Sequence, residues 1–169
     1  MDRRKFLERS GLLSTLGVGA CATTMELRAN EPKVGMGGLP TAARTTIAAA
    51  QEHMLPSSIS SPGALSVNAI GYLDAAIRQG AVPPEQLASL IRGAEALDKR
   101  AGGAFANAPQ KDALLRAYQK TPDGEAWMTA VLSYALEALL GDPIHGGNPG
   151  GIAWAWAGIR PPFPRPRKQ

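Results

Sequence analysis

The sequence predicts an all-α fold, an irregular bundle of about five helices over residues 41–141 that is followed by a C-terminal arm. Three observations lead to this prediction. Apolar residues recur at intervals of three and four, which places them on one face of a helix. Proline and glycine stand at the borders of these periodic segments, where they start and stop helices. No segment alternates apolar and polar residues as a half-buried strand does.

The first two helices are expected between Pro40 and Gly80. One begins after Pro40-Thr41 and stops at Pro56, and its apolar face consists of Ala43, Ile47, Ala50 and Met54. A loop over residues 57–63 separates it from the second helix, whose apolar positions are Leu65, Ala69, Tyr72, Leu73, Ala76 and Ile77. Gly80 then closes this helix as a left-handed cap, a conformation that glycine adopts without steric strain.

Three further helices are expected up to Gly141. The third starts at Pro83-Pro84, ends at Gly102-Gly103, and carries Leu87, Leu90, Ile91, Ala94 and Leu97 on one face. A shorter helix over residues 111–120 buries Leu114, Leu115 and Tyr118. The last helix has Thr121 as its N-cap and Pro122 at its first position. Its apolar face consists of Met128, Val131, Leu132, Ala135 and Leu139.

The composition changes at residue 142, where glycine and proline become dense up to residue 169. Such a segment gains little from regular structure, so we expect an ordered or docking arm and not another helix. Two tryptophans in it can each bury about 150–250 Å², either in the protein's own core or against a partner. The residues predicted to contact a partner are Asp142, Pro143, His145, Gly146, Gly147, Asn148, Trp154 and Trp156.

The N-terminus is predicted to be an export signal over residues 1–22, followed by a linker over residues 23–40. Arg3 and Arg4, followed by Phe6 and Leu7, resemble the twin-arginine signal. The uncharged run that follows is shorter than the roughly 20 residues needed to span a bilayer. Cys21 has two interpretations that the sequence leaves open: a lipidated residue at the start of the mature chain, or a small residue in a removed peptide.

Charge and cysteine content exclude several functions. The net charge is +4, but the basic residues gather at both ends, and residues 22–159 hold 10 basic against 12 acidic side chains, which argues against nucleic-acid binding. One cysteine and two histidines exclude an internal disulfide, a haem attachment motif, a histidine-rich metal site and a thiolate-bound iron–sulfur cluster. We therefore expect no cofactor in this chain.

Candidate catalytic groups are few. His53 lies late in the first predicted helix, and His145 lies in the arm close to Asp142, but neither forms a recognisable set with a nucleophile. The glycines over residues 146–151 lack the Lys and Ser or Thr of a phosphate-binding loop and the strand that precedes one. We interpret them as turn positions, and no catalytic residue is predicted.

Several stretches together form a family pattern. They are Thr46–Pro56, Pro62-Gly63-Ala64, Tyr72-Leu73-Asp74, the weaker Gly103-Ala104-Phe105 and Gln110–Leu115, and the stronger Leu140–Asn148 with Trp154 and Gly158–Pro161. From about Thr41 to Pro161, the chain resembles the gluconate 2-dehydrogenase subunit 3 family on these residues. The last group matches the family pattern Asp-Pro, any residue, Tyr-Gly-Gly-Asn. His145 stands where tyrosine is usual, Ala153 replaces a glycine, and Ser57 and Ser58 stand where acidic residues are usual.

The resemblance implies an accessory subunit without a cofactor. A large GMC-type flavoprotein partner would carry FAD and oxidise a sugar, sugar acid or alcohol, and a cytochrome c subunit with haem c would receive the electrons. This chain would help the flavoprotein to mature and to leave the cell through the twin-arginine translocase. We expect it in the periplasm or on the outer face of the cytoplasmic membrane, touching the membrane only through a partner or a lipid on Cys21. The alternative is a free-standing periplasmic or lipid-anchored binding protein.

Overall fold

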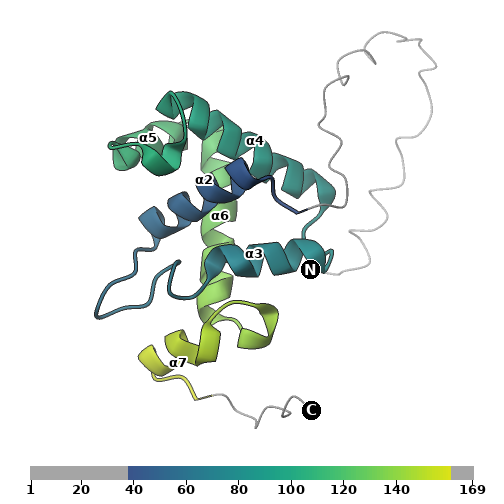
Figure 1. Ribbon diagram of the computed structural model, residues 1–169, viewed down its shortest axis with the longest axis vertical. Helices are drawn as coiled ribbons and strands as arrows, with labels where there is room; N and C mark the ends of the chain where they lie inside the picture. The colour runs from purple at the N-terminus through teal and green to yellow at the C-terminus, as the bar shows by residue number, and fades with distance from the viewer. Residues whose placement is uncertain (1–37, 161–169) are drawn as a thin grey trace, which may run out of the picture. The chain divides into compact units, whose positions relative to one another are not determined.

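The computed structural model describes residues 38–160, and every regular element within them is helical (Figure 1). The α-helices are α2 (Thr41–Met54), α3 (Ala69–Arg78), α4 (Pro84–Ala101), α5 (Lys111–Gln119), α6 (Pro122–Leu140) and α7 (Ile152–Trp156). Three short 3-10 segments join them: η1 (Phe105–Asn107), η2 (Pro143–His145) and η3 (Pro149–Gly151). The predicted export signal, the linker up to residue 37 and the arm beyond residue 160 lie outside the described residues.

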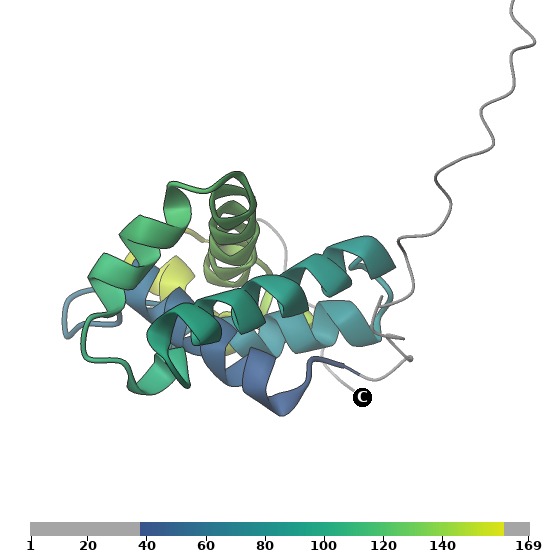
Figure 2. The ribbon, with the colours of Figure 1, turned by 90° about the horizontal axis from the view of Figure 1, so that it is seen from above.

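Helix α6 is the central element of the bundle. Figure 1 shows it along the long axis, with α4, α2 and α3 crossing it one below the other, and each of these three helices contacts it. Figure 2, from above, shows α6 nearly end-on beside the layer of the other helices. The all-helical bundle predicted from the sequence is therefore confirmed, with α6 connecting the α4–α5 end to the arm.

One core contact joins α6 to α4 through Trp127, which is 2% exposed. Its indole Nε1 donates to the Leu90 carbonyl oxygen at 2.9 Å. Gly93 lies against the ring so closely that a Cβ at this position would collide with it. Trp127 was not among the residues predicted to be buried in this helix. Of the face predicted for α6, Val131, Ala135 and Leu139 are buried, whereas Met128 and Leu132 are half-buried at its edge.

Most helix ends follow the predicted local chemistry. The Thr121 hydroxyl oxygen accepts a hydrogen bond from the Gly124 amide at 3.1 Å, so the predicted N-cap of α6 is confirmed. Gly80 and Gly102 are left-handed, with φ of +70° and +71°, at the ends of α3 and α4. The left-handed conformation ends each helix and turns the chain away from it. Glycine stands at these positions because other residues rarely adopt that conformation.

Two predictions about secondary structure are wrong. Helix α3 begins at Ala69, not near Leu65, because Asn68 is left-handed with φ of +55° and breaks the helical run. Leu65, predicted on the buried face, is 77% exposed. The arm was expected to contain no helix, yet it holds α7, which begins after the left-handed Gly151.

Candidate functional site

The arm turns back on the bundle immediately after α6. The Asp142 carboxylate accepts a hydrogen bond from the Ile144 amide at 3.0 Å, which caps η2. Gly146 then reverses the chain with φ of +95°. The Asn68 side-chain amide donates to the Gly146 carbonyl oxygen at 2.9 Å, and this bond joins the turn to the residue that precedes α3.

Gly147 brings the arm against the backbone of α6. A Cβ at this position would lie 2.8 Å from the Ala138 Cα and 2.9 Å from its carbonyl oxygen, so any larger residue would push the two segments apart. The glycine in this motif is therefore explained by close approach.

Asn148 is the main anchor of the arm. It is fully buried and left-handed, with φ of +45°. Its backbone amide donates to the Val67 carbonyl oxygen at 2.8 Å, and its side-chain Nδ2 donates to the Gly141 carbonyl oxygen at 3.3 Å. Its Oδ1 accepts from the Ala153 amide at 2.8 Å, at the first turn of α7. One side chain thus joins the end of α6 to the start of α7.

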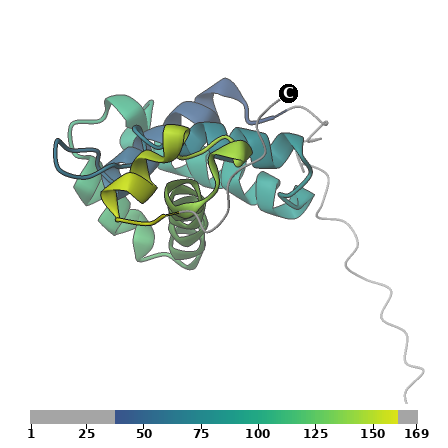
Figure 3. The same cartoon turned by 90° about the horizontal axis from the view of Figure 1, so that it is seen from below.

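The two tryptophans of α7 have different surroundings. Trp154 is half-buried, and its Nε1 donates to the Leu140 carbonyl oxygen at 2.8 Å. Trp156 is 56% exposed, and its Nε1 donates to the Ser60 carbonyl oxygen at 2.8 Å. The helix ends at the left-handed Gly158, after which the Ile159 amide donates back to the Trp154 carbonyl oxygen at 2.8 Å. Figure 3, from below, shows α7 with the turns of the arm at the end of the bundle.

The structure does not bring the two histidines together into a reactive set. His145 is exposed on η2, and its backbone amide donates to the Asp142 carbonyl oxygen at 3.0 Å. His53 Nε2 lies 3.7 Å from Asp112 Oδ1 on the exposed side of α2. The Arg116 guanidinium, and after it His53, holds the pKa of the Asp112 carboxyl below its usual range. Residues 38–160 contain no group of three or more His, Cys, Asp and Glu side chains that could hold a metal ion.

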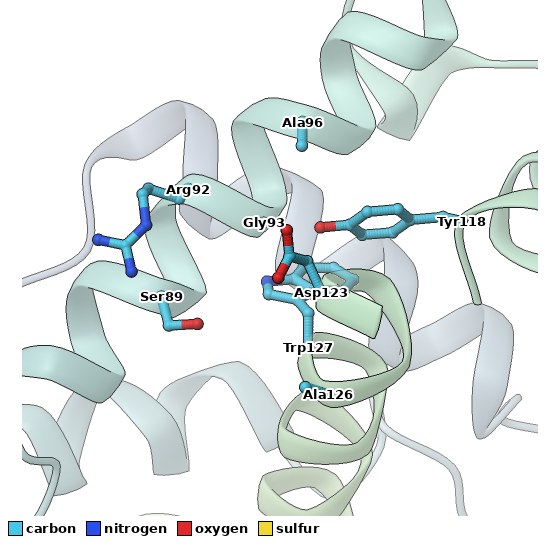
Figure 4. A pocket seen from close by; sticks show the side chains of 8 residues that line it. All are labelled: Ser89, Arg92, Gly93, Ala96, Tyr118, Asp123, Ala126 and Trp127. Carbon is cyan, nitrogen blue, oxygen red and sulfur yellow. The ribbon is translucent and has the colours of Figure 1, made fainter. Parts of the chain in front are cut away.

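A hollow of about 280 Å³ lies between α4 and the first turns of α6. Figure 4 shows Tyr118 and Asp123 on one side of it and Arg92 on the other. Burial, and secondarily the Asp123 carboxylate, raises the pKa of the Tyr118 hydroxyl. The lining holds a carboxylate, a guanidinium and hydroxyl groups.

A wider groove of about 490 Å³ runs along the last turns of α6, lined by Tyr72, Leu136, Glu137 and Leu140 among others. The Tyr72 hydroxyl donates to the Glu137 carboxylate at 3.0 Å. Burial and then this hydrogen bond raise the pKa of Tyr72.

None of the helices in the described part of the chain is long and apolar enough to cross a membrane.

Sequence reasoning missed the group that organises the loop before α3. The Glu52 carboxylate, on the last turn of α2, accepts from the Ser57 amide at 2.8 Å and from the Leu65 amide at 2.7 Å. No local motif identifies such a contact, because its second partner lies 13 residues away. The available signal was the position of Glu52 near the C-terminal end of a predicted helix. A negative charge there is unfavourable with respect to the helix dipole, which suggests that it has a partner elsewhere.

The family model described as gluconate 2-dehydrogenase subunit 3 matches residues 41–161, which include all the helices described above. No curated protein and no solved structure matches the chain.

Proposed function

Because the chain belongs to the gluconate 2-dehydrogenase subunit 3 family, we propose that it is the accessory subunit of a flavin dehydrogenase and supports the export, maturation and assembly of that enzyme. The family match carries this proposal. The catalytic partner is a GMC-type flavoprotein that holds FAD and oxidises a sugar, sugar acid or alcohol. A cytochrome c subunit with haem c receives the electrons. The chain described here contributes no cofactor and no catalytic residue.

The proposed route out of the cell is the twin-arginine translocase, which carries folded proteins. Arg3 and Arg4, with Phe6 and Leu7, are the signal, and a flavoprotein without a signal of its own travels with this subunit. The complex then lies in the periplasm or on the outer face of the cytoplasmic membrane. Cys21 either is removed with the signal or carries a lipid that holds the subunit at the membrane.

The arm is the proposed contact with the flavoprotein. Its backbone is fixed to the bundle by Gly147 and Asn148, so the segment that carries its exposed side chains needs little ordering on binding. Ile144 is 68% exposed and Trp156 is 56% exposed. Large apolar side chains on a rigid backbone bind a partner with little loss of conformational entropy, which makes Trp156 the best candidate for an anchor.

The test is the affinity of the purified flavoprotein for Trp156→Ala. Truncation of an anchoring tryptophan typically weakens binding by 2 kcal/mol or more, about thirtyfold. Helical circular dichroism should stay at the wild-type level because the ring is more than half exposed. Lys120→Ala, in the turn between α5 and α6 and far along α6 from the arm, is the control and should bind normally. Wild-type affinity for both Trp156→Ala and Ile144→Ser would show that the arm is not the interface.

A further inference from the structure

The exposed apolar side chains are unevenly distributed along the chain. In the part of the chain that the structure describes, every exposed large hydrophobic residue lies within residues 59–65 or 136–159. None comes from residues 66–135, which form α3, α4, α5 and most of α6. The set is Ile59, Leu65, Leu136, Leu140, Ile144, Ile152, Trp156 and Ile159. The first two belong to the loop between α2 and α3, which no sequence argument linked to binding.

This loop is held in one conformation although it lies at the surface. Glu52 accepts hydrogen bonds from the amides of Ser57 and Leu65, and so closes the loop at both ends. The Ser58 hydroxyl oxygen accepts from the Ser61 amide at 3.0 Å, inside the loop. Gly63 packs against the start of the loop so closely that a Cβ would collide with backbone there. Ile59 is therefore fully exposed to solvent on a turn that these contacts constrain.

The loop and the arm contact each other directly. The Trp156 Nε1 donates to the Ser60 carbonyl oxygen across 96 residues of sequence. A second connection runs from the Asn148 amide to the Val67 carbonyl oxygen at 2.8 Å, just after the loop. Figure 1 shows the loop and α7 near each other at the lower end of the bundle. The two groups of exposed apolar side chains thus belong to one end of the molecule.

From this geometry we infer that the loop over residues 57–65 and the arm over residues 142–159 form a single docking face for the flavin dehydrogenase subunit, and that Glu52 is the residue that positions the loop half. This inference rests on the function proposed above. It adds Ile59 and Leu65 to the contact, and it makes the Trp156–Ser60 hydrogen bond the connection between the two halves.

Area and charge favour a protein as the occupant. The exposed parts of the six large apolar side chains in this face amount to several hundred Å² of apolar surface, which approaches the ~800 Å² that one partner contributes to a standard interface. Residues 57–65 carry no charged side chain, and residues 142–159 carry only Asp142. An anionic membrane surface or a nucleic acid would require Lys and Arg here, whereas the core of a protein interface is depleted of charge.

The experiment measures the affinity of the full-length chain for the purified dehydrogenase subunit. Ile59→Ser combined with Leu65→Ser should weaken binding by tenfold or more, and it should leave the unfolding midpoint unchanged because both side chains are exposed. Trp156→Phe keeps an aromatic ring of smaller size but removes the donor to Ser60, so it should weaken binding less than Trp156→Ala. Ala113→Ser on α5 is a matched surface control that should bind normally.

Glu52→Gln tests the positioning role separately. The amide nitrogen of glutamine accepts no hydrogen bond, so one of the two backbone donors loses its partner. Amide exchange at Ser57 or Leu65 should accelerate while exchange in α4 and α6 stays the same. The loss of affinity should largely disappear when Glu52→Gln is added to the Ile59→Ser, Leu65→Ser variant, because the glutamate acts through those side chains. Full additivity would contradict the positioning role.

The outcomes separate the two proposals. If the wild-type chain does not bind the dehydrogenase subunit, the proposed function fails. If it binds, and Trp156→Ala weakens the complex while Ile59→Ser with Leu65→Ser does not, the function stands and the two-part face is wrong. If the isolated chain is a dimer that these two substitutions dissociate, the face serves a second copy and the inference is also overturned.

Discussion

Replacement of Asn148 by alanine tests how the arm is attached to the bundle. The substitution removes the Oδ1 acceptor of the Ala153 amide and the weaker donor to the Gly141 carbonyl oxygen. It also places alanine at φ of +45°, a conformation that a residue with a Cβ adopts only at a cost. Asn148 is fully buried, so water cannot replace the lost hydrogen-bond partners.

The magnitude follows from these two effects. A buried amide left without a partner destabilises by about 1–3 kcal/mol, and the left-handed conformation costs alanine roughly a further 1 kcal/mol. We expect Asn148→Ala to lower the free energy that holds α7 in place by about 2–4 kcal/mol. Asn148→Gly is the matched control, because glycine loses the same hydrogen bonds but tolerates the backbone conformation. It should be the less damaging of the two by about 1 kcal/mol.

The assay is native-state amide hydrogen exchange at Ala157, whose amide donates to the Ala153 carbonyl oxygen within α7. Exchange should accelerate by about 30- to 1,000-fold in Asn148→Ala, which corresponds to the expected free energy. Exchange in the middle of α4 should change much less. If Ala157 exchanges at the wild-type rate in Asn148→Ala, α7 does not depend on Asn148 and the account of the arm is refuted.

Three further predictions concern the core, the export signal and the cofactor. Gly93→Ala should lower the free energy of unfolding by about 1–3 kcal/mol because the new Cβ displaces Trp127. The control Gly103→Ala should change this free energy little because no atom lies near the new Cβ. Denaturant unfolding measures both variants. Arg3→Lys with Arg4→Lys should retain this protein and its co-expressed flavoprotein in the cytoplasm, and unchanged periplasmic amounts would contradict the signal. The chain purified alone should show no visible absorbance, and stoichiometric flavin, haem or metal would overturn the expectation of a cofactor-free subunit.

The helices were predictable where local chemistry determines them. Pro122 after Thr121 begins α6, and glycines at 80 and 102 end α3 and α4, because capping and left-handed turns depend on neighbouring residues only. Leu65 is spaced like a helical residue, at four residues before Ala69. Its amide nevertheless donates to the Glu52 carboxylate, which holds Leu65 in the loop. The spacing of apolar residues gives no information about this contact.

The sequence indicated that the arm differs from the helices before it, but it did not indicate the conformation of the arm. Its glycines and tryptophans indicated turns and anchors, yet a five-residue helix such as α7 has too few internal hydrogen bonds to be recognised from propensity. It exists because Asn148 accepts from its first turn and Gly147 lets the chain approach α6. The same limit applies to Trp127, whose role depends on Gly93, which lies 34 positions earlier in the chain.

The central claim is that this chain is a subunit of a flavin dehydrogenase. The most direct test is size-exclusion chromatography with light scattering on the full-length chain co-expressed with the flavin dehydrogenase subunit of the same organism. The account predicts a single species that contains both chains and whose flavin absorbance belongs to the dehydrogenase subunit. Separate elution of the two proteins, with the dehydrogenase equally mature and active when this chain is omitted, would contradict it.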